Sequence, residues 1–252
     1  MGNFKTLLLS LCLGTVSFAN ADVHLSQGEV DYYSVKQVKI VEIENDPMMN
    51  EVKKTILEQN YDQNQPFYPN QNFQNPTPSS SGSIGKIIAV GKDLIALGES
   101  VYKLVDKGRP SNQTTYAPIS VLPRINGEYA DIFETENWKA PKKKTYSITY
   151  TNFYGMDVVK FRYSVIFAYG GSFNGVGAYI TSAQIIPESI MTSFGFDFTA
   201  SMKLGGMTNI GTKANPEASI ILTLEYTVET ILQASFEADS YTLTGKGVVK
   251  SL

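Results

Sequence analysis

The feature that most constrains the fold is a regular alternation of apolar and polar residues in the second half of the chain. It runs through residues 157–169, 189–203 and 217–236. Because successive side chains of a strand point to opposite faces, this period predicts antiparallel sheet with one buried face. A fully extended segment 217–236 would span roughly 68 Å. We therefore expect it to bend, bulge or break into two strands.

Weaker strand patterns at 145–152, 176–186 and 239–250 extend the series. Roughly seven strands separated by turn signals are typical of a β-sandwich. The sequence therefore predicts a mainly β protein, with an antiparallel β-sandwich of about seven strands over residues 109–252.

A different period precedes this region, in residues 84–108. Apolar residues recur there every three or four positions, and Gly91 and Gly98 share their face. Ser83 is a plausible N-cap, and Gly108 followed by Pro110 is a stop signal. The pattern predicts one amphipathic helix, packed on the sheet or, as an alternative, in contact with a membrane.

The first part of the chain divides by composition. Residues 22–60 predict a small strand-helix segment, with a strand over Tyr32–Ile43 and a short helix that begins at Asp46 and Pro47. Residues 61–83 are rich in Asn, Gln and Pro, and such a composition predicts a disordered linker.

Residues 1–21 have the pattern of a cleavable signal peptide. Lys5 precedes an apolar run of about a dozen residues, and the small residues Ala19 and Ala21 follow it. We therefore expect an exported protein, periplasmic or extracellular. The single cysteine, Cys12, lies within this segment, so the exported chain is expected to contain no disulfide.

The composition excludes several functions. The formal net charge is −3, which does not favour nucleic acid or anionic membranes. The single histidine, His24, excludes a His-dependent triad and a multi-histidine zinc site. No metal ligand set, cofactor or catalytic group is predicted. A carboxylate pair, as in glycoside hydrolases, is the one catalytic type left open. Its candidates are Asp131, Glu134, Glu136, Glu225 and Glu229.

Two short features suggest contact with a partner. Trp138, the only tryptophan, is either half-buried core or a sugar-stacking platform. Lys142, Lys143 and Lys144 are either a charged turn or a site for an anionic ligand. Tyr146, like Tyr150 and Tyr154, suits the same sugar-stacking role as Trp138. A glycan or a protein of the envelope or cell surface is the expected partner.

The leading hypothesis is therefore a secreted, non-enzymatic protein with a binding or envelope-structural role. One alternative is a membrane-active, pore-forming-like protein that uses a helix at 84–107. The other is a carboxylate-type glycoside hydrolase.

Overall fold

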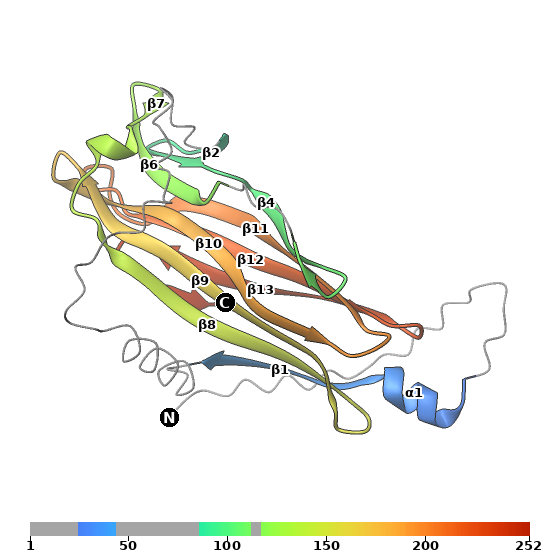
Figure 1. Ribbon diagram of the computed structural model, residues 1–252. Helices are drawn as coiled ribbons and strands as arrows, with labels where there is room; N and C mark the ends of the chain where they lie inside the picture. Colours follow the sequence, from blue (N-terminus) through green and yellow to red (C-terminus); the bar gives the residue numbers. More distant parts are fainter. Residues whose placement is uncertain (1–24, 44–85, 112–116) are drawn as a thin grey trace, which may run out of the picture.

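The computed structural model describes residues 25–43, 86–111 and 117–252 (Figure 1). These residues form fourteen strands, one α-helix and one short 3₁₀ helix. In chain order the elements are α1 Gln27–Tyr33, β1 Val35–Ile43, β2 Ile87–Val90, β3 Leu94–Leu97, β4 Val101–Asp106, β5 Arg109–Pro110, β6 Ile119–Ile125, β7 Glu128–Tyr129, η1 Ile132–Glu134, β8 Lys139–Asn152, β9 Asp157–Phe173, β10 Val176–Thr192, β11 Asp197–Asn209, β12 Ala218–Glu229, β13 Ala234–Thr244 and β14 Val249–Ser251. The predicted signal peptide 1–21, the helix after Pro47 and the linker 61–83 lie outside the described residues.

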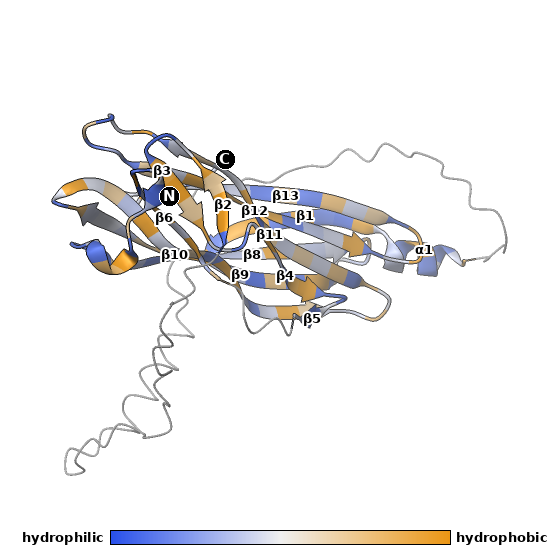
Figure 2. Cartoon of the chain, turned by 90° about the horizontal axis from the view of Figure 1, so that it is seen from above, coloured by the Kyte–Doolittle hydropathy of each residue, from blue (hydrophilic) through white to orange (hydrophobic). Residues whose placement is uncertain are grey.

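The strands form two sheets, which confirms the predicted β-sandwich. The first sheet has the order β1-β8-β9-β10-β6-β3-β2, with β7 paired to β6, and the second has the order β14-β13-β12-β11-β4-β5. All of these strand pairs are antiparallel. The long strands β8 to β13 extend along the molecule as two layers (Figures 1 and 2).

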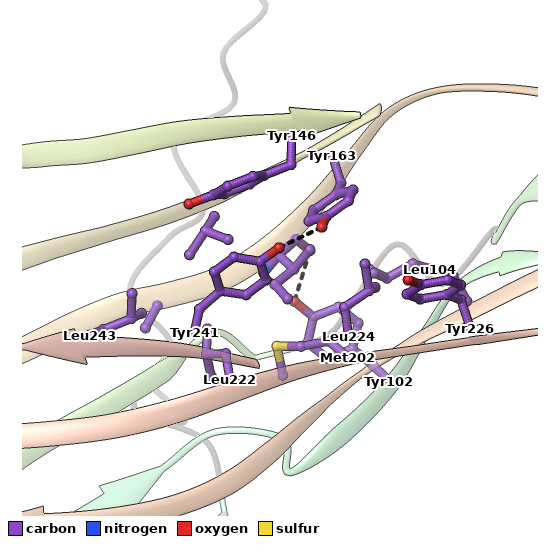
Figure 3. Close-up of a cluster of buried hydrophobic side chains, with 14 of the residues drawn as sticks. Tyr102, Leu104, Tyr146, Tyr163, Met202, Leu222, Leu224, Tyr226, Tyr241 and Leu243 are labelled. Atoms are coloured by element: carbon purple, nitrogen blue, oxygen red, sulfur yellow. Dashed lines mark hydrogen bonds between the residues drawn. The ribbon is translucent and has the colours of Figure 1, made fainter. Parts of the chain in front are cut away.

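Side chains from both sheets interlock in an aromatic core between the layers (Figure 3). In β9 the alternation identifies the inward face correctly, since Phe161, Tyr163, Val165 and Phe167 are fully buried. The segment 217–236 breaks into two strands, β12 and β13, which pair antiparallel over their whole lengths. Alternate residues of each strand therefore form the core, as the alternation in the sequence predicts.

The predicted helix at 84–108 is wrong, because this segment forms β2, β3 and β4. Two turns separate the strands, and each contains one of the two glycines. Gly91 donates its N–H to the carbonyl of Leu94, 2.8 Å away. Gly98 has φ +132°, and a Cβ atom there would lie 2.7 Å from the carbonyl oxygen of Pro118. The seven-residue spacing of two turns resembles the repeat of a helical face.

These strands belong to the sandwich. All four residues of β3 are buried, because Leu94 and Ala96 face the main core while Ile95 and Leu97 join a smaller cluster with Leu122. The sandwich therefore extends beyond the predicted range 109–252 and includes β1 to β4.

The N-terminal strand begins later than predicted. Tyr32 and Tyr33 belong to α1, and β1 starts at Val35. A capping box begins the helix, because the Ser26 side chain accepts the N–H of Glu29 and the Glu29 side chain accepts the N–H of Ser26. This Ser-x-x-Glu pattern favours a helix start over an extended chain.

Candidate functional site

The three predicted binding lysines lie in β8, where neighbouring side chains point to opposite faces. Lys142 donates to the carbonyl of Gly247 at 2.6 Å and lies 5.0 Å from the centroid of the Tyr169 ring. Lys144 forms an ion pair with Glu42 at 2.6 Å. Lys143 pairs instead with Glu188, also at 2.6 Å. The lysines therefore hold three separate parts of the fold and do not form one anion site.

Glu188 is the centre of a polar cluster on β8, β9 and β10. It accepts a hydrogen bond from Ser164 and lies 3.7 Å from Arg162, besides its ion pair with Lys143. Burial raises the pKa of the Glu188 carboxyl, but the bonds to Lys143 and Ser164 and the charges of Lys143 and Arg162 outweigh it and hold this pKa below its ordinary value. Ser164 and Arg162 lie on the neighbouring strand β9 and Lys143 lies one strand further, on β8, so the cluster links three strands of the first sheet.

Trp138 is half-buried and packs on Gly171. A side chain at 171 would overlap the indole ring, so glycine is required there. The indole N–H donates to the Thr135 hydroxyl at 3.1 Å. Leu122 and its buried neighbours lie under the same ring. These contacts correspond to the half-buried interpretation of Trp138.

Tyr146 belongs to the core. Its ring lies 5.6 Å from that of Tyr163 and 4.8 Å from that of Tyr241, measured between centroids (Figure 3). Burial, with a smaller contribution from the Glu42 charge, raises the pKa of Tyr146 well above its ordinary value. The side chain therefore stays neutral and packs between the sheets.

Most of the predicted carboxylate candidates are engaged in local structure. Asp131 and Glu134 form the capping box of η1. Glu225 lies 3.4 Å from Lys203 on the next strand. Within the described ranges, no three His, Cys, Asp or Glu side chains are grouped as a metal site would require.

A carboxyl pair that the sequence did not single out lies on β13. The Tyr226 hydroxyl is 2.9 Å from Asp239 and 3.2 Å from Glu237, so it donates to this pair. Burial is the first cause that raises the pKa of each carboxyl above its ordinary value. Tyr150 lies near this pair. Burial, and after it the charge of Glu237, raises the pKa of the Tyr150 hydroxyl well above its ordinary value. This hydroxyl makes no well-aligned hydrogen bond with another of the described residues.

The most distinctive exposed surface lies at one end of the sandwich, at two hairpins and at the turn by which the chain passes from one sheet to the other. They join β8 to β9, β10 to β11 and β12 to β13, at residues 153–156, 193–196 and 230–233. We call this the hairpin-tip surface, and its exposed apolar side chains are Phe153, Tyr154, Met156, Phe194, Ile231 and Leu232. Phe194 is 86% exposed. Large apolar side chains gathered on exposed turns are typical of interaction surfaces.

Strand order places the three tips side by side. β8 and β9 are neighbours in the first sheet, and Thr192, which ends β10, pairs with Val159 near the start of β9. From Thr192 the chain passes to β11 in the second sheet. Asp197, which begins β11, is paired with Glu229, which ends β12. Figure 1 shows the three turns at the same end of the two layers, near α1.

α1 joins two of the tips. The hydroxyl of Tyr32 donates to the carbonyl of Phe194 at 3.2 Å, and that of Tyr154 donates to the carbonyl of Gly28 at 3.1 Å. Below the first tip, the buried Asn152 accepts the N–H groups of Tyr154 and Met156 and donates to the carbonyl of Tyr32. The exposed side chains therefore stand on a backbone that is held in place.

Charge also distinguishes this end. None of the twelve tip residues is charged, whereas Asp157, Asp197 and Glu229 lie next to the tips along the chain. Lys160 pairs with Asp157 at 3.6 Å, and the β4–β5 turn that carries Lys107 lies against the start of β11. The hairpin-tip surface is thus uncharged and apolar, with charges of both signs beside it.

Sequence reasoning missed this surface because the alternation continues through it. Phe194 has the same parity as the buried Phe196 and Phe198, and the pattern therefore predicts one strand over 189–203. The structure breaks this segment at 193–196. Gly195, with φ +76°, is the available turn signal.

Comparison with protein-family models, with curated proteins and with solved structures finds no match. Among the described residues, no helix has the length and apolar character needed to cross a membrane.

Proposed function

We propose that this chain is an exported, non-enzymatic binding protein and that it contacts a protein partner of the envelope or cell surface through the hairpin-tip surface. The observation that carries the proposal is the grouping of three uncharged, apolar hairpin tips at one end of a rigid sandwich. Aromatic, Ile, Leu and Met side chains on a preorganised backbone provide the central contacts of protein interfaces.

The chemistry of the surface favours a protein over a glycan or a lipid. Sugar sites need polar groups beside the aromatic rings, and the exposed tip side chains are mostly hydrocarbon. The twelve tip residues include no Lys or Arg, the residues that attract a protein to an anionic bilayer. The tips therefore fit a partner that has an apolar groove.

The membrane-active alternative was motivated by a helix at 84–107, and the strands found there remove that motivation. The glycoside-hydrolase alternative needs a pair of free carboxylates. Asp131 and Glu134 instead cap η1, and Glu225 pairs with Lys203. Neither alternative is favoured by a specific observation.

The test is retention of envelope proteins from the producing organism on the immobilised protein. A Phe194→Ser/Ile231→Ser variant should lose the specific partner, because it removes two of the most exposed apolar side chains. Phe133→Ser is the matched control, since Phe133 is 91% exposed but lies in η1, away from the tips.

Retention that is equal in both variants, or turnover of a glycan by the protein, would contradict the proposal. Sedimentation with neutral phosphatidylcholine vesicles that is lost in the tip variant would instead identify a lipid as the ligand, and would also contradict it.

A further inference from the structure

β13 has one edge that is only partly paired. Along its whole length, Ala234–Thr244, it pairs with β12. On the other side, β14 pairs with Tyr241, Thr242 and Leu243, and the N–H of Leu252 donates to the carbonyl of Ser240. In the part of the chain that the structure describes, no strand pairs with the remaining edge, residues 234–239.

Backbone groups on this edge are oriented outward. In a strand, the N–H and C=O of alternate residues point to the same side. The carbonyl of Ser240 accepts from Leu252 and the N–H of Thr244 donates to Val248, so both groups point away from β12. The backbone groups of the other even-numbered residues, Ala234, Phe236 and Ala238, therefore point to the free edge as well. Such a row of donors and acceptors is a template for a further strand.

The side chains beside this edge are of two kinds. Glu237 and Asp239 share the face of the buried Tyr241 and point between the sheets. Phe236 and Ala238 point to the outer face, where Phe236 is 68% exposed. A strand added here would place alternate side chains beside two carboxylates and beside an apolar surface.

Within the described chain, no Lys or Arg forms an ion pair with Glu237 or Asp239. Their hydrogen-bonding neighbour is Tyr226, which is neutral. Burial raises the pKa of both carboxyl groups, so ionising them in this place is costly. A cation delivered from outside would remove that cost.

We propose that the free edge of β13, residues 234–239, binds an extended segment of a partner protein by strand addition, and that this segment alternates basic with apolar residues. The edge supplies main-chain hydrogen bonds, while Glu237 and Asp239 select the basic side chains and Phe236 contacts the apolar ones. An apolar strand is rejected, because it would bury both carboxylates further without placing a cation beside them. This inference does not depend on the hairpin-tip surface.

A fluorescein-labelled peptide, Val-Lys-Val-Lys-Val-Lys-Val with blocked ends, is the probe, and fluorescence anisotropy measures its binding to the full chain. Two control peptides accompany it. One has Glu in place of every Lys, and the other has the same composition with the three Lys residues grouped at one end. Only the alternating basic peptide should bind.

Glu237→Gln/Asp239→Asn should weaken the binding of this peptide about tenfold or more. The matched control is Glu225→Gln, which changes an acid on the adjacent strand that is already paired with Lys203. It should alter the affinity less than about twofold, because its side chain lies on the outer face.

Ala238→Pro tests the main-chain contact. It removes an N–H from the free edge and leaves the β12 ladder intact, so the peptide should no longer bind. Should this variant fail to fold, a peptide N-methylated at alternate residues replaces it and should fail to bind the wild-type chain.

Three results would overturn the inference. They are equal binding of the alternating and the grouped basic peptides, unchanged affinity after N-methylation or Ala238→Pro, and equal losses in Glu225→Gln and the double variant. The first and third would show charge attraction alone, and none of them bears on the Phe194→Ser/Ile231→Ser test of the hairpin-tip surface.

Discussion

The hydroxyl groups of Tyr163 and Tyr241 form a 2.6 Å hydrogen bond in the centre of the sandwich, one from each sheet (Figure 3). Both side chains are fully buried. Replacing one tyrosine with phenylalanine leaves the other hydroxyl buried without its partner, which should cost about 1–3 kcal/mol of unfolding free energy. Urea denaturation of Tyr163→Phe and Tyr241→Phe measures this.

The double variant Tyr163→Phe/Tyr241→Phe provides the control. It removes both hydroxyls, so it should be less destabilised than the sum of the single variants, with a coupling of about 1 kcal/mol or more. Additive effects would contradict a hydrogen bond between these two residues.

Asn152 should be essential for the shape of the first hairpin tip. Its buried amide makes three hydrogen bonds, to Tyr154, Met156 and Tyr32. Asn152→Ala should cost about 2–4 kcal/mol, because it leaves three partly buried backbone groups without their partner. Thermal unfolding tests this, and hydrogen exchange should show faster exchange at residues 153–156. Unchanged exchange there would contradict the role of Asn152.

Gly98→Ala separates the strand and helix interpretations of residues 84–108. In an exposed helix interior this change would stabilise the protein by about 1 kcal/mol. In the structure, φ is +132° and the added Cβ would overlap the Pro118 carbonyl, so the variant should be clearly destabilised. A raised melting temperature would contradict the turn between β3 and β4.

Glu237 and Asp239 should make stability depend on pH. Burial raises their pKa values in the folded state above the ordinary 4.5 and 3.8. Between the ordinary and the folded pKa values the folded chain therefore holds more protons than the unfolded chain, and this part of the stability is lost as the pH rises through the folded pKa values.

In the variant Glu237→Gln/Asp239→Asn this loss is absent. The variant should be more stable than the wild type at pH 8 by about 1 kcal/mol or less, and the difference should shrink towards pH 3.5. Melting temperatures across this pH range measure it. A wild type that becomes relatively more stable as the pH rises would contradict the raised pKa values.

The sequence predicts the buried face correctly where a strand crosses the centre of the sandwich. There the period decides burial, as Phe161 and Tyr163 show. The period fails where turns fall in register with it. Phe194 continues the pattern of Phe198 although it lies on a turn, and the turns at Gly91 and Gly98 repeat like a helical face.

The candidate site residues could not be assigned from the sequence for a related reason. Lys142, Lys143 and Lys144 are adjacent in the chain, but a strand directs neighbours to opposite faces, and their partners are far away in sequence. Glu237 and Asp239 look like surface acids until β12 places Tyr226 beside them. Such partners depend on strand register, which a single sequence does not show.

The central claim is that the hairpin-tip surface contacts a protein. The most direct measurement is photo-crosslinking from p-benzoylphenylalanine placed at Phe194, with the same substitution at Phe133 as control, in the producing organism. We predict a discrete protein adduct from position 194 that disappears when Ile231→Ser and Leu232→Ser are added, and no such adduct from position 133. The same adducts from both positions, or an adduct at 194 that survives loss of the neighbouring tip, would contradict the claim.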